Sequence, residues 1–434
     1  MILAQDELVD TSAGLDPLYN SGNDWLPVLL ITGLKVVIAF AFLLVAFAFL
    51  LVAVMLNIWF LRKVISDFQN RIGPNTAGRW GILQSLADGI KLFFKEDLIP
   101  DNSDRFAFKL APYLSLVPAF LVFAIIPIGG DFNGDDGDGV VSIFGHDTLL
   151  QVADPPVGVL WFLAMSSLAI YGVMLAGWSS GSKYPLIGSV RASAQMVSYE
   201  AALGLALASV LLVSGTLSTH AMVIDQSGEG PAFFGIENIL PAWYLLPVGI
   251  VPFVVFIIAG TAELNHPPFD LVEAEQEIVG GFHTEYSSIR FALFFLAEFM
   301  NQITMGALLV TLFLGGPNGP AFFFPEGWWI GVFWFFVKLM GFLFLLVWVR
   351  ATLPRFRYDQ LVDFGWKLLI PLSLGWFILL AFIQIGRDED WSTAQFVGLG
   401  VGLAAVFVAL AGMLTLAIRN ARNERIEEME DAHG

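Results

Sequence analysis

Carboxyl groups crowd together in one stretch of this 434-residue sequence, AELNHPPFDLVEAEQEIVGGFHTEY at residues 262–286. The acidic residues of this stretch are Glu263, Asp270, Glu273, Glu275, Glu277 and Glu285. No Lys or Arg occurs between Arg191 and Arg290, so the acids have no local counter-ions. Apolar residues are interleaved with them, which favours partial burial of the segment.

The spacing of these acids predicts that they interact with one another. In a helix, Asp270, Glu273 and Glu277 would share one face. In an extended segment, Glu273, Glu275 and Glu277 would instead share one side. Carboxylates this close cannot all ionise cheaply, so some of their pKa values should rise and the group should titrate jointly. Such a group can hold and pass protons near neutral pH. The alternative interpretation is an acidic loop in solvent.

Two further acids fall within predicted membrane helices. Glu200 lies near the start of a helix expected at 195–216, and Glu298 lies about a third of the way into one expected at 287–315. An ionisable residue at membrane depth costs at least about 2.5 kcal/mol and therefore indicates function by default. A hydrogen bond between helices is the structural alternative. Lys338 invites the same reasoning, although a lysine can extend its amine to the membrane surface.

A short amphipathic helix is predicted at GILQSLADGIKLFFKE, residues 81–96. Its polar stripe consists of Gln84, Asp88, Lys91 and Lys95, and its opposite face is apolar. One interpretation is a helix lying on lipid at the membrane interface. The other is a helix that roofs a cavity with its stripe facing a polar group. The mixed sign of the stripe favours the cavity, because lipid-seeking helices are more often uniformly basic.

Basic residues and one histidine are possible charge partners for these acids. They are Arg191, His266, Arg290, Arg350, Arg355 and Arg357. His266 is expected to titrate near neutrality, so its charge should depend on pH. The three arginines of RATLPRFRYDQL, residues 350–361, could equally be ordinary anchors on the cytoplasmic side of the membrane.

The composition places these groups in a membrane protein. Hydrophobic residues make up 57% of the chain, charged residues make up 14%, and the mean hydropathy is +0.73. A soluble domain carries about 25% charged residues. The predicted fold class is an all-α polytopic membrane protein. The nine apolar stretches that predict membrane helices are 27–60, 107–129, 157–178, 195–216, 241–262, 287–315, 328–352, 366–386 and 392–418. The first is too long for an upright helix and should tilt.

The basic residues predict the orientation. Of 21 Lys and Arg, 18 fall in alternate connections, which should therefore be cytoplasmic and should leave the N-terminus outside. Much of the net charge of −18 comes from Asp-rich outer loops, which indicates a solvated surface or, as a weaker interpretation, a saline habitat. The first ten residues carry no basic n-region, so no cleaved signal peptide is expected.

The predicted organisation is one integral membrane domain, residues 1–434. Its non-membrane parts are an outer N-terminal segment (1–26), a cytoplasmic connection with the amphipathic helix (61–106), the acidic cytoplasmic loop (263–286) and a cytoplasmic tail (419–434).

Several kinds of chemistry are disfavoured. There is no cysteine, which removes disulfides, thiolate metal sites and iron–sulfur ligation. The five histidines have no metal-ligand spacing, no Walker A motif occurs, and the chain is expected to hold no metal and no redox centre. The stretch DFNGDDGDG at 131–139 is similar to a calcium loop but lacks its glycine and its final glutamate.

Four segments together carry a family resemblance. They are QNRIGPNTAGRWGILQSLADGIKLFFKED (69–97), GSKYPLIGSVRASAQMVSYE (181–200), AELNHPPFDLVEAEQE (262–277, running on to 299) and RATLPRFRYDQL (350–361). They cover about a quarter of the chain. The sequence resembles the quinone-site membrane subunit (the H subunit, or subunit 1) of proton-pumping NADH:quinone oxidoreductase, which is respiratory complex I.

The resemblance implies a function for the singled-out residues. Arg71, Gln84, Asp88 and Lys91 would belong to a quinone chamber entered from the side. The acids of 263–285, with Glu200 and Glu298, would begin a carboxylate path, whose protons respond when quinone reduction or exit changes the nearby charge. The chain would be a non-redox subunit of a proton translocase in the plasma membrane of a prokaryote, inactive alone. Quinone would be its substrate, FMN and iron–sulfur clusters would belong to partner subunits, and no nucleic acid would bind. The implied partners are peripheral quinone-site subunits, antiporter-like membrane subunits and membrane lipid.

The sequence departs from the family pattern at four positions. Leu61 replaces the usual Glu before Arg-Lys, His266 replaces an Arg, Gly181 replaces an Asn and Ser85 replaces a Pro. The first two put details of the chamber in question. Two other functions stay open: the membrane anchor of an energy-converting hydrogenase or formate-hydrogenlyase complex, and a stand-alone proton-coupled transporter. The transporter would predict internal repeats, and the sequence shows none.

Overall fold

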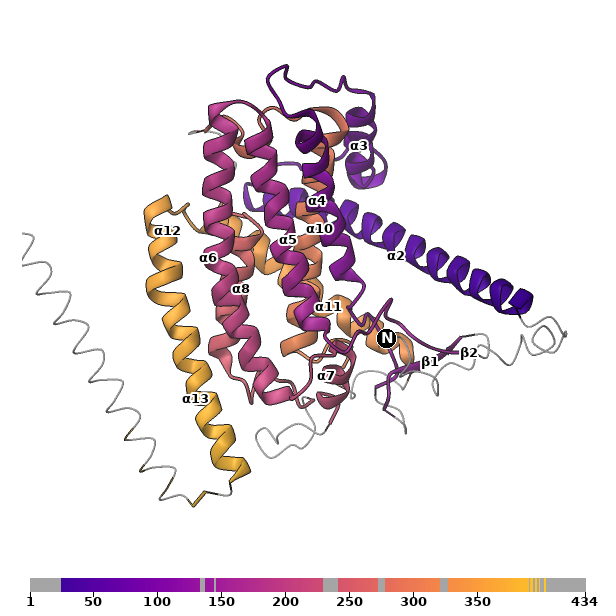
Figure 1. Cartoon of the computed structure of the whole chain (residues 1–434), viewed down its shortest axis with the longest axis vertical. Helices are drawn as coiled ribbons and strands as arrows, with labels where there is room; N and C mark the ends of the chain where they lie inside the picture. The colour runs from indigo at the N-terminus through magenta and orange to yellow at the C-terminus, as the bar shows by residue number, and fades with distance from the viewer. Residues whose placement is uncertain are drawn as a thin grey trace, which may run out of the picture. The chain divides into compact units, whose positions relative to one another are not determined.

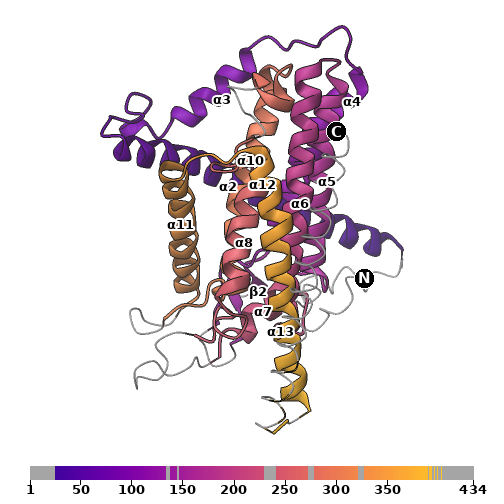
Figure 2. The same cartoon turned by 90° about the vertical axis from the view of Figure 1, so that its left-hand side faces the viewer.

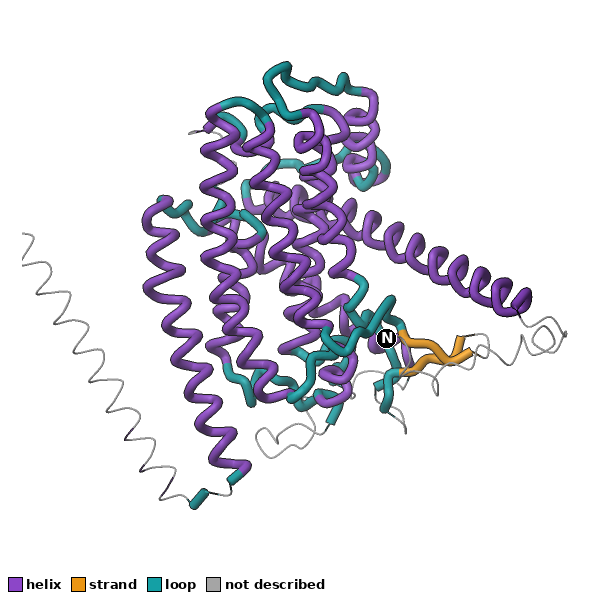
Figure 3. Tube along the Cα trace, in the orientation of Figure 1, coloured by secondary structure: helices purple, strands orange, loops and turns teal. Residues whose placement is uncertain are grey.

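The structure is a computed structural model that describes residues 25–132, 137–143, 146–228, 241–271, 278–320, 327–389, 391, 392, 395, 398 and 402. The predicted all-α polytopic membrane fold is confirmed (Figure 1). Seven of the described helices are long and apolar enough to cross a membrane. The tube in Figure 3 shows that the described chain also contains shorter helices, joined by loops, and one short hairpin.

The chain separates into two compact units, residues 1–377 and residues 378–434. All predicted site residues belong to the first unit. In the second unit, the rings of Phe382 and Trp391 meet edge to face with centroids 5.4 Å apart. The predicted single membrane domain therefore stays a prediction.

The first described helix, α2 (Trp25–Phe68), has 44 residues. Its length is about 66 Å at 1.5 Å per residue, against a hydrocarbon core of about 30 Å. Figures 1 and 2 show it running obliquely to α4, α5 and α6. The predicted stretch 27–60 thus continues as helix for about two further turns to Phe68, and this extension contains Arg62 and Lys63.

Five helices pack into a bundle. They are α4 (Arg105–Phe123), α5 (Gly158–Ser179), α6 (Lys183–Ser214), α8 (Ile250–Glu263) and α10 (Ser288–Phe313). In space α5 packs on α4 and α6, α8 packs on α6, and α10 packs on α4 (Figure 1). Small residues allow close approach: a Cβ on Gly177 of α5 would collide with Ser189 and the Pro185 carbonyl on α6.

The remaining elements join or flank the bundle. Helix α11 (Trp328–Thr352) packs on α10 and α2. It is followed by α12 (Tyr358–Phe364), the π-helical turn η4 (Gly365–Leu369) and α13 (Ile370–Asp388). Helix α7 (Thr219–Asp225) and an antiparallel hairpin lie at the end of the bundle opposite to helix α3 (Gln84–Phe94) (Figure 1). The strands of the hairpin are β1 (Val140–Ile143) and β2 (His146–Leu149), with Val140 opposite Leu149.

Two predicted helix starts lie far from the observed ones. Helix α6 begins at Lys183 rather than 195. Its polar first turns are helical because Pro185 and Ser189 pack closely against Gly177 of α5. Glu200 is therefore in the interior of a helix and not at its start. Helix α8 begins at Ile250 rather than 241, because Gly249 adopts φ 91°, a conformation that favours glycine and ends the preceding turns. The predicted helix 392–418 lies largely outside the described residues.

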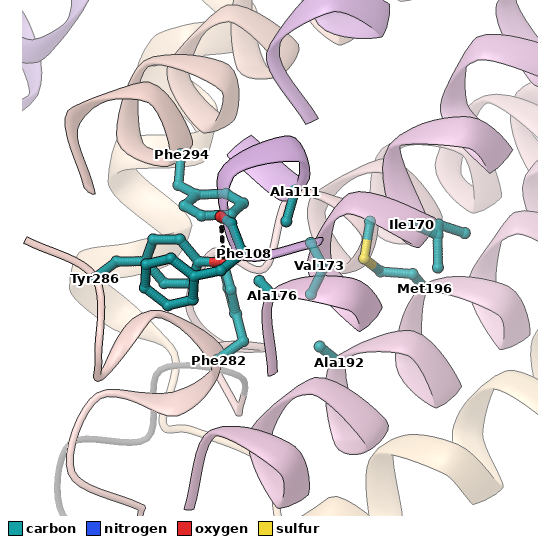
Figure 4. Packing of buried hydrophobic residues seen from close by; sticks show 10 residues of the cluster. All are labelled: Phe108, Ala111, Ile170, Val173, Ala176, Ala192, Met196, Phe282, Tyr286 and Phe294. Carbon is teal, nitrogen blue, oxygen red and sulfur yellow. Dashed lines mark hydrogen bonds between the residues drawn. The ribbon is translucent and has the colours of Figure 1, made fainter. Parts of the chain in front are cut away.

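The core joins the acidic segment to the bundle (Figure 4). The rings of Phe108 on α4 and Tyr286 stack with centroids 4.0 Å apart and planes 4° apart. The Tyr286 hydroxyl donates a hydrogen bond of 3.0 Å to the Phe108 carbonyl. Phe282, on the 3-10 turn η2 (Gly281–His283), packs in the same cluster as Met196 of α6. The chain after the acidic loop is therefore held against α4, α5 and α6.

Lys338 has a structural environment that the sequence did not indicate. Its ammonium donates hydrogen bonds to the backbone carbonyls of Leu314 (2.6 Å), Gly316 (2.9 Å) and Asn318. The same nitrogen lies 4.7 Å from the centre of the Trp243 ring. Three donors on three acceptors use the full capacity of a charged lysine. The residue thus ties α11 to the turn that follows α10.

We expect Lys338→Met to destabilise the protein by about 3 kcal/mol, because it leaves carbonyls without partners in a partly buried place. The measurement is thermal unfolding of the purified complex in detergent. Lys91→Met is the control, since the Lys91 side chain is 70% exposed. Equal melting temperatures for the two variants would contradict the structural role.

Candidate functional site

A large cavity opens where α2 ends. Its volume is about 770 Å³, and it is lined by the last turns of α2, the loop that follows, and the end of α11. The charged residues in its wall are Arg62, Arg71 and Arg350. Apolar side chains such as Leu61 and Ile72 complete the wall. The cavity therefore combines an apolar surface with a positive one. We call it the large cavity.

The loop at the large cavity is held by close backbone contacts. The Arg71 amide donates to the Ser66 carbonyl over 2.9 Å, which turns the chain back on α2. Gly81 has φ 75°, and a Cβ there would collide with the Pro74 backbone. The Trp59 indole donates to the Trp80 carbonyl over 3.0 Å. The close contact at Gly81 explains why a glycine is needed there. Together these contacts hold the segment around RIGPN (71–75), and with it Arg71, in the cavity wall.

The predicted amphipathic helix is present as the 3-10 turn η1 (Arg79–Gly81) and α3 (Gln84–Phe94). Asp88 on its polar stripe accepts a hydrogen bond from Gln84 over 3.1 Å and forms an ion pair of 2.7 Å with Arg62. The Lys91 ammonium is 4.0 Å from Asp88 and points mostly into solvent. Asp88 and Gln84 thus act on the large cavity through Arg62.

Arg62 is a site residue that the sequence analysis missed. It lines the large cavity and also a second one of about 250 Å³. In the sequence, this arginine counted only among the basic residues that predict the orientation of the chain. Its position at the end of a long apolar run, with an aspartate on the following amphipathic helix, was the signal available.

The second cavity brings opposite charges together. The charged and ionisable residues in its wall are Arg62, His266, Asp270, Glu298 and Arg350. Arg62 belongs to α2, Glu298 to α10 and Arg350 to α11. His266 and Asp270 belong to the segment that follows α8. Figure 2 shows α2, α10 and α11 close to one another in this part of the molecule. We call this the ionic cavity, because two arginines face two carboxylates across it.

His266 is neutral at the ionic cavity. Burial and the nearby Arg350 charge lower the pKa of His266 to about 4, although the Gln302 amide partly opposes this shift. The imidazole Nδ1 lies 3.4 Å from Glu298 Oε1. The expectation that this histidine titrates near neutrality is therefore wrong, because its side chain is only 6% exposed.

Two smaller inner cavities, of about 70 and 30 Å³, continue from Glu298 into the bundle. Glu298 lines the first of them, and Glu263 and Asn301 line both. Glu263 accepts a hydrogen bond from Ser166 on α5, and Glu200 accepts one from the adjacent Ser167. The structure therefore brings Asp270, Glu298, Glu263 and Glu200 into one region, as the carboxylate prediction requires.

The segment that carries these groups is held by Gln195 on α6. Its side-chain amide donates to the Ala262 carbonyl over 2.8 Å and to the Phe269 carbonyl over 3.0 Å. His283 lines the first inner cavity and Asn301 lines both, and neither was predicted as a site residue. Burial lowers the pKa of His283 to about 4, so it too is neutral. In the sequence, His283 is only a histidine that follows the acidic loop, and Asn301 is only a polar residue one helical turn after Glu298. Neither pattern is specific enough to predict a site residue.

Several predicted residues lie elsewhere. Glu273, Glu275 and Glu277 are outside the described residues. Glu285 is half-buried in the turn before α10 and lines none of these four cavities.

Four of the six suggested charge partners also lie away from these four cavities. Arg191 lies over the Tyr358 ring at 5.1 Å, Arg290 pairs with Asp97 at 3.0 Å, Arg357 pairs with Asp359 at 3.0 Å, and Arg355 is exposed. Of the six, Arg350 and His266 line the ionic cavity with the carboxylates.

In the part of the chain that the structure describes, no cluster of three His, Asp or Glu side chains is placed to hold a metal ion. The possible calcium loop at 131–139 lies partly outside the described residues.

Comparison with known proteins identifies the family. A family model described as NADH dehydrogenase matches residues 40–381. The H subunit of NADH-quinone oxidoreductase from Frankia alni is 47% identical over 403 residues, which are 92% of this chain and 82% of that protein. The chain belongs to the H-subunit family. Members from Frankia casuarinae and Streptomyces avermitilis are 47% and 45% identical over 97% and 94% of this chain, and over 86% and 84% of their own lengths.

Membership of the H-subunit family agrees with the resemblance read from the four sequence segments. All residues that line the four cavities lie within the matched range 40–381. The long apolar helices and the family together make this chain a multi-pass membrane protein.

Proposed function

We propose that this chain is the membrane subunit of an NADH-quinone oxidoreductase that admits the quinone and begins the proton path. The observation that carries the proposal is the row of cavities. The large cavity and the ionic cavity share Leu61, Arg62 and Arg350, and the ionic cavity shares Glu298 with the first inner one. The names of the related subunits support this function over an anchor for a hydrogenase complex and over a stand-alone transporter.

The large cavity suits a quinone. Binding pockets for small molecules have volumes of about 300–1,000 Å³ and contain polar groups that orient the ligand. The arginines can donate hydrogen bonds to quinone oxygens, while Leu61, Ile65 and Phe68 offer apolar contact to a tail. Asp88 keeps Arg62 oriented. The predicted chamber residues Arg71, Gln84 and Asp88 thereby gain distinct roles, in the wall or behind it.

The carboxylates suit a proton path. Charge that appears at the large cavity would act on Arg62 and Arg350, which also face Asp270 and Glu298. Glu298 and Glu263 then share the first inner cavity, and the adjacent hydroxyls Ser166 and Ser167 bond Glu263 and Glu200. A proton can move along such a chain of ionisable groups when the local charge changes.

Electron transfer belongs, in this proposal, to other subunits. The chain contains no cysteine, and we assign FMN and iron–sulfur clusters to the peripheral partners. The chain would then act as a non-redox part of a proton translocase, inactive alone, with antiporter-like subunits receiving the effect. Its place would be the plasma membrane of a prokaryote, with the N-terminus outside and the C-terminus in the cytoplasm.

Photolabelling tests the quinone assignment. The assembled complex would be illuminated with an azidoquinone, and the labelled peptides of this chain would be mapped by mass spectrometry. We expect label within 61–74 or at 350–351, which line the large cavity, and loss of that label when excess unmodified quinone is present. Label found only in other segments of this chain, or on the peripheral subunits alone, would contradict the assignment.

A further inference from the structure

We propose that Ser288 and Arg290, at the start of α10, are positioning residues for quinone binding, because they hold α3 in place beside the large cavity. This inference rests on the proposed function. Neither residue lines any of the four cavities, so both act through α3 and its ion pair with Arg62. The sequence suggested Arg290 only as a charge partner for the acidic stretch, and Ser288 was not predicted as a site residue.

Packing alone does not hold α3 in place. None of its residues is buried, and the aromatic side chains of its last turn, Phe93 and Phe94, are 72% and 88% exposed. Side chains that stay exposed to the surroundings contribute little of the free energy that burial within the protein supplies. Contact with lipid would set the depth of the helix but not its place relative to α2 and α10. The position of α3 therefore depends on the polar contacts along it and at its end.

The first turns of α3 are tied to α2. The Ser85 hydroxyl donates a hydrogen bond to the Met55 carbonyl over 3.1 Å. One turn further on, the Asp88 carboxylate pairs with Arg62 at 2.7 Å. Because Arg62 lines both the large and the ionic cavities, a shift of α3 would move Asp88 and with it the guanidinium in the cavity wall.

The last turn of α3 is tied to α10. Carbonyl groups at the C-terminal end of a helix have no partner within that helix. The Ser288 hydroxyl shares its proton between two of them, the carbonyls of Lys95 at 2.7 Å and Leu92 at 3.0 Å. The neighbouring Ser287 hydroxyl accepts a hydrogen bond from the Leu98 amide over 2.8 Å. The start of α10 thus caps the end of α3.

A partly buried ion pair strengthens this connection. The Arg290 guanidinium lies 3.0 Å from the Asp97 carboxylate, and the two side chains are 15% and 34% exposed. The guanidinium also lies 5.8 Å from the centre of the Phe108 ring of α4. Because the pair is partly shielded from water, its attraction is stronger than that of a fully exposed pair. Arg290 therefore fixes the segment that follows α3 against the bundle.

The backbone of Ser288 supports a positioning role. Its φ of 54° is in the left-handed region, which few residues other than glycine adopt, and the residue is only 3% exposed. A glycine would fit this backbone more easily but would have no hydroxyl to donate to α3. The contact with the carbonyls of α3 accounts for a serine at a position that favours glycine.

Charge reversal tests the ion pair in the assembled complex. Asp97→Arg and Arg290→Asp each place like charges together, and the double variant restores the pair with its polarity reversed. We expect each single variant to lower kcat/KM for a short-chain quinone by about tenfold, because small displacements of a binding group are costly. Hydrogen–deuterium exchange of the amides of 84–98 should become faster. The double variant should recover both properties.

Two comparisons show whether the effect passes through Arg62. Asp97→Arg should add little to the loss caused by Arg62→Met, because both act on the same interaction. Asp101→Arg is the matched control, since it makes the same change of charge at an exposed aspartate of the same connection. We expect its kcat/KM and its exchange to match those of the parent protein.

Ser288→Gly gives a milder test, which decides the question if the charge-reversed chains do not assemble. It removes the hydroxyl and leaves a residue that adopts the observed φ without strain. We expect faster exchange in α3 and a lower kcat/KM for quinone. Parent kcat/KM in Ser288→Gly and in the assembled charge-reversed variants would overturn the inference, whether or not exchange becomes faster. Normal quinone kinetics in Arg62→Met would instead overturn the assignment of quinone to the large cavity.

Discussion

Glu263→Gln is expected to lower quinone-coupled proton transfer by at least about a hundredfold, the typical effect of removing a positioned acid or base. Glu263 lines both inner cavities, and its Oε1 accepts a hydrogen bond from Ser166. Its Oε2 is buried without a hydrogen-bond partner among the described residues. Glutamine keeps the shape of this side chain and removes the exchangeable proton. The measurement is proton uptake by proteoliposomes that contain the assembled complex, with NADH oxidation by artificial acceptors followed in parallel.

Glu285→Gln is the matched comparison for this experiment. Both residues belong to the acidic stretch of the sequence, but Glu285 lines none of the four cavities. We expect the Glu285 variant to pump normally. Equal loss of pumping in the two variants would indicate that general acidity of the stretch matters rather than the inner cavities. Normal pumping in Glu263→Gln would remove Glu263 from the path.

Arg62→Met is expected to lower quinone turnover by about tenfold to a hundredfold, which corresponds to the loss of a charge-assisted interaction of about 1.5–3 kcal/mol. Methionine retains the apolar stem in the wall and removes the guanidinium. Arg62 lines the large and the ionic cavities and pairs with Asp88 at 2.7 Å. Steady-state kinetics with a short-chain quinone would measure KM and kcat separately.

Lys63→Met is the control for the arginine variant. Lys63 is the next residue on α2 and carries the same charge, but it lines none of the four cavities. We expect its kinetics to be unchanged. The double variant Arg62→Met with Asp88→Asn should be little worse than Arg62→Met alone, because Asp88 acts on the cavity through Arg62. Additive losses would show that Asp88 acts on the quinone by another route.

Local sequence patterns predicted most of the helices of this protein well. The narrow polar stripe of 81–96 predicted α3, which is present, and Asp88 on this stripe pairs with Arg62. Where prediction failed, the cause was local: a polar helix segment at Lys183 looked like a loop, and Gly249 shortened α8. The first error arises because hydropathy measures burial in lipid, whereas polar residues that pack between helices also form helix. The second arises because an apolar stretch can be interrupted by turns, here where Gly249 adopts a positive φ.

The candidate site was harder to predict. Its ion pairs and hydrogen bonds join residues far apart in the chain: Arg62 and Asp88 are separated by 26 positions, and Ser166 and Glu263 by 97. No periodic pattern specifies which of several arginines faces which acid. The suggested partners Arg290 and Arg357 instead pair with Asp97 and Asp359.

Composition and periodicity alone establish a polytopic helical membrane protein, because the free energy of transferring each residue into lipid adds along the chain. They also show acidic residues in membrane helices and in a loop where basic residues are expected. The partners of those acids, and the cavities they share, follow from how α2, α10 and α11 pack around the segment after α8. Electrostatic interactions depend on distance in space, and distances between remote segments are set only when the helices are packed together.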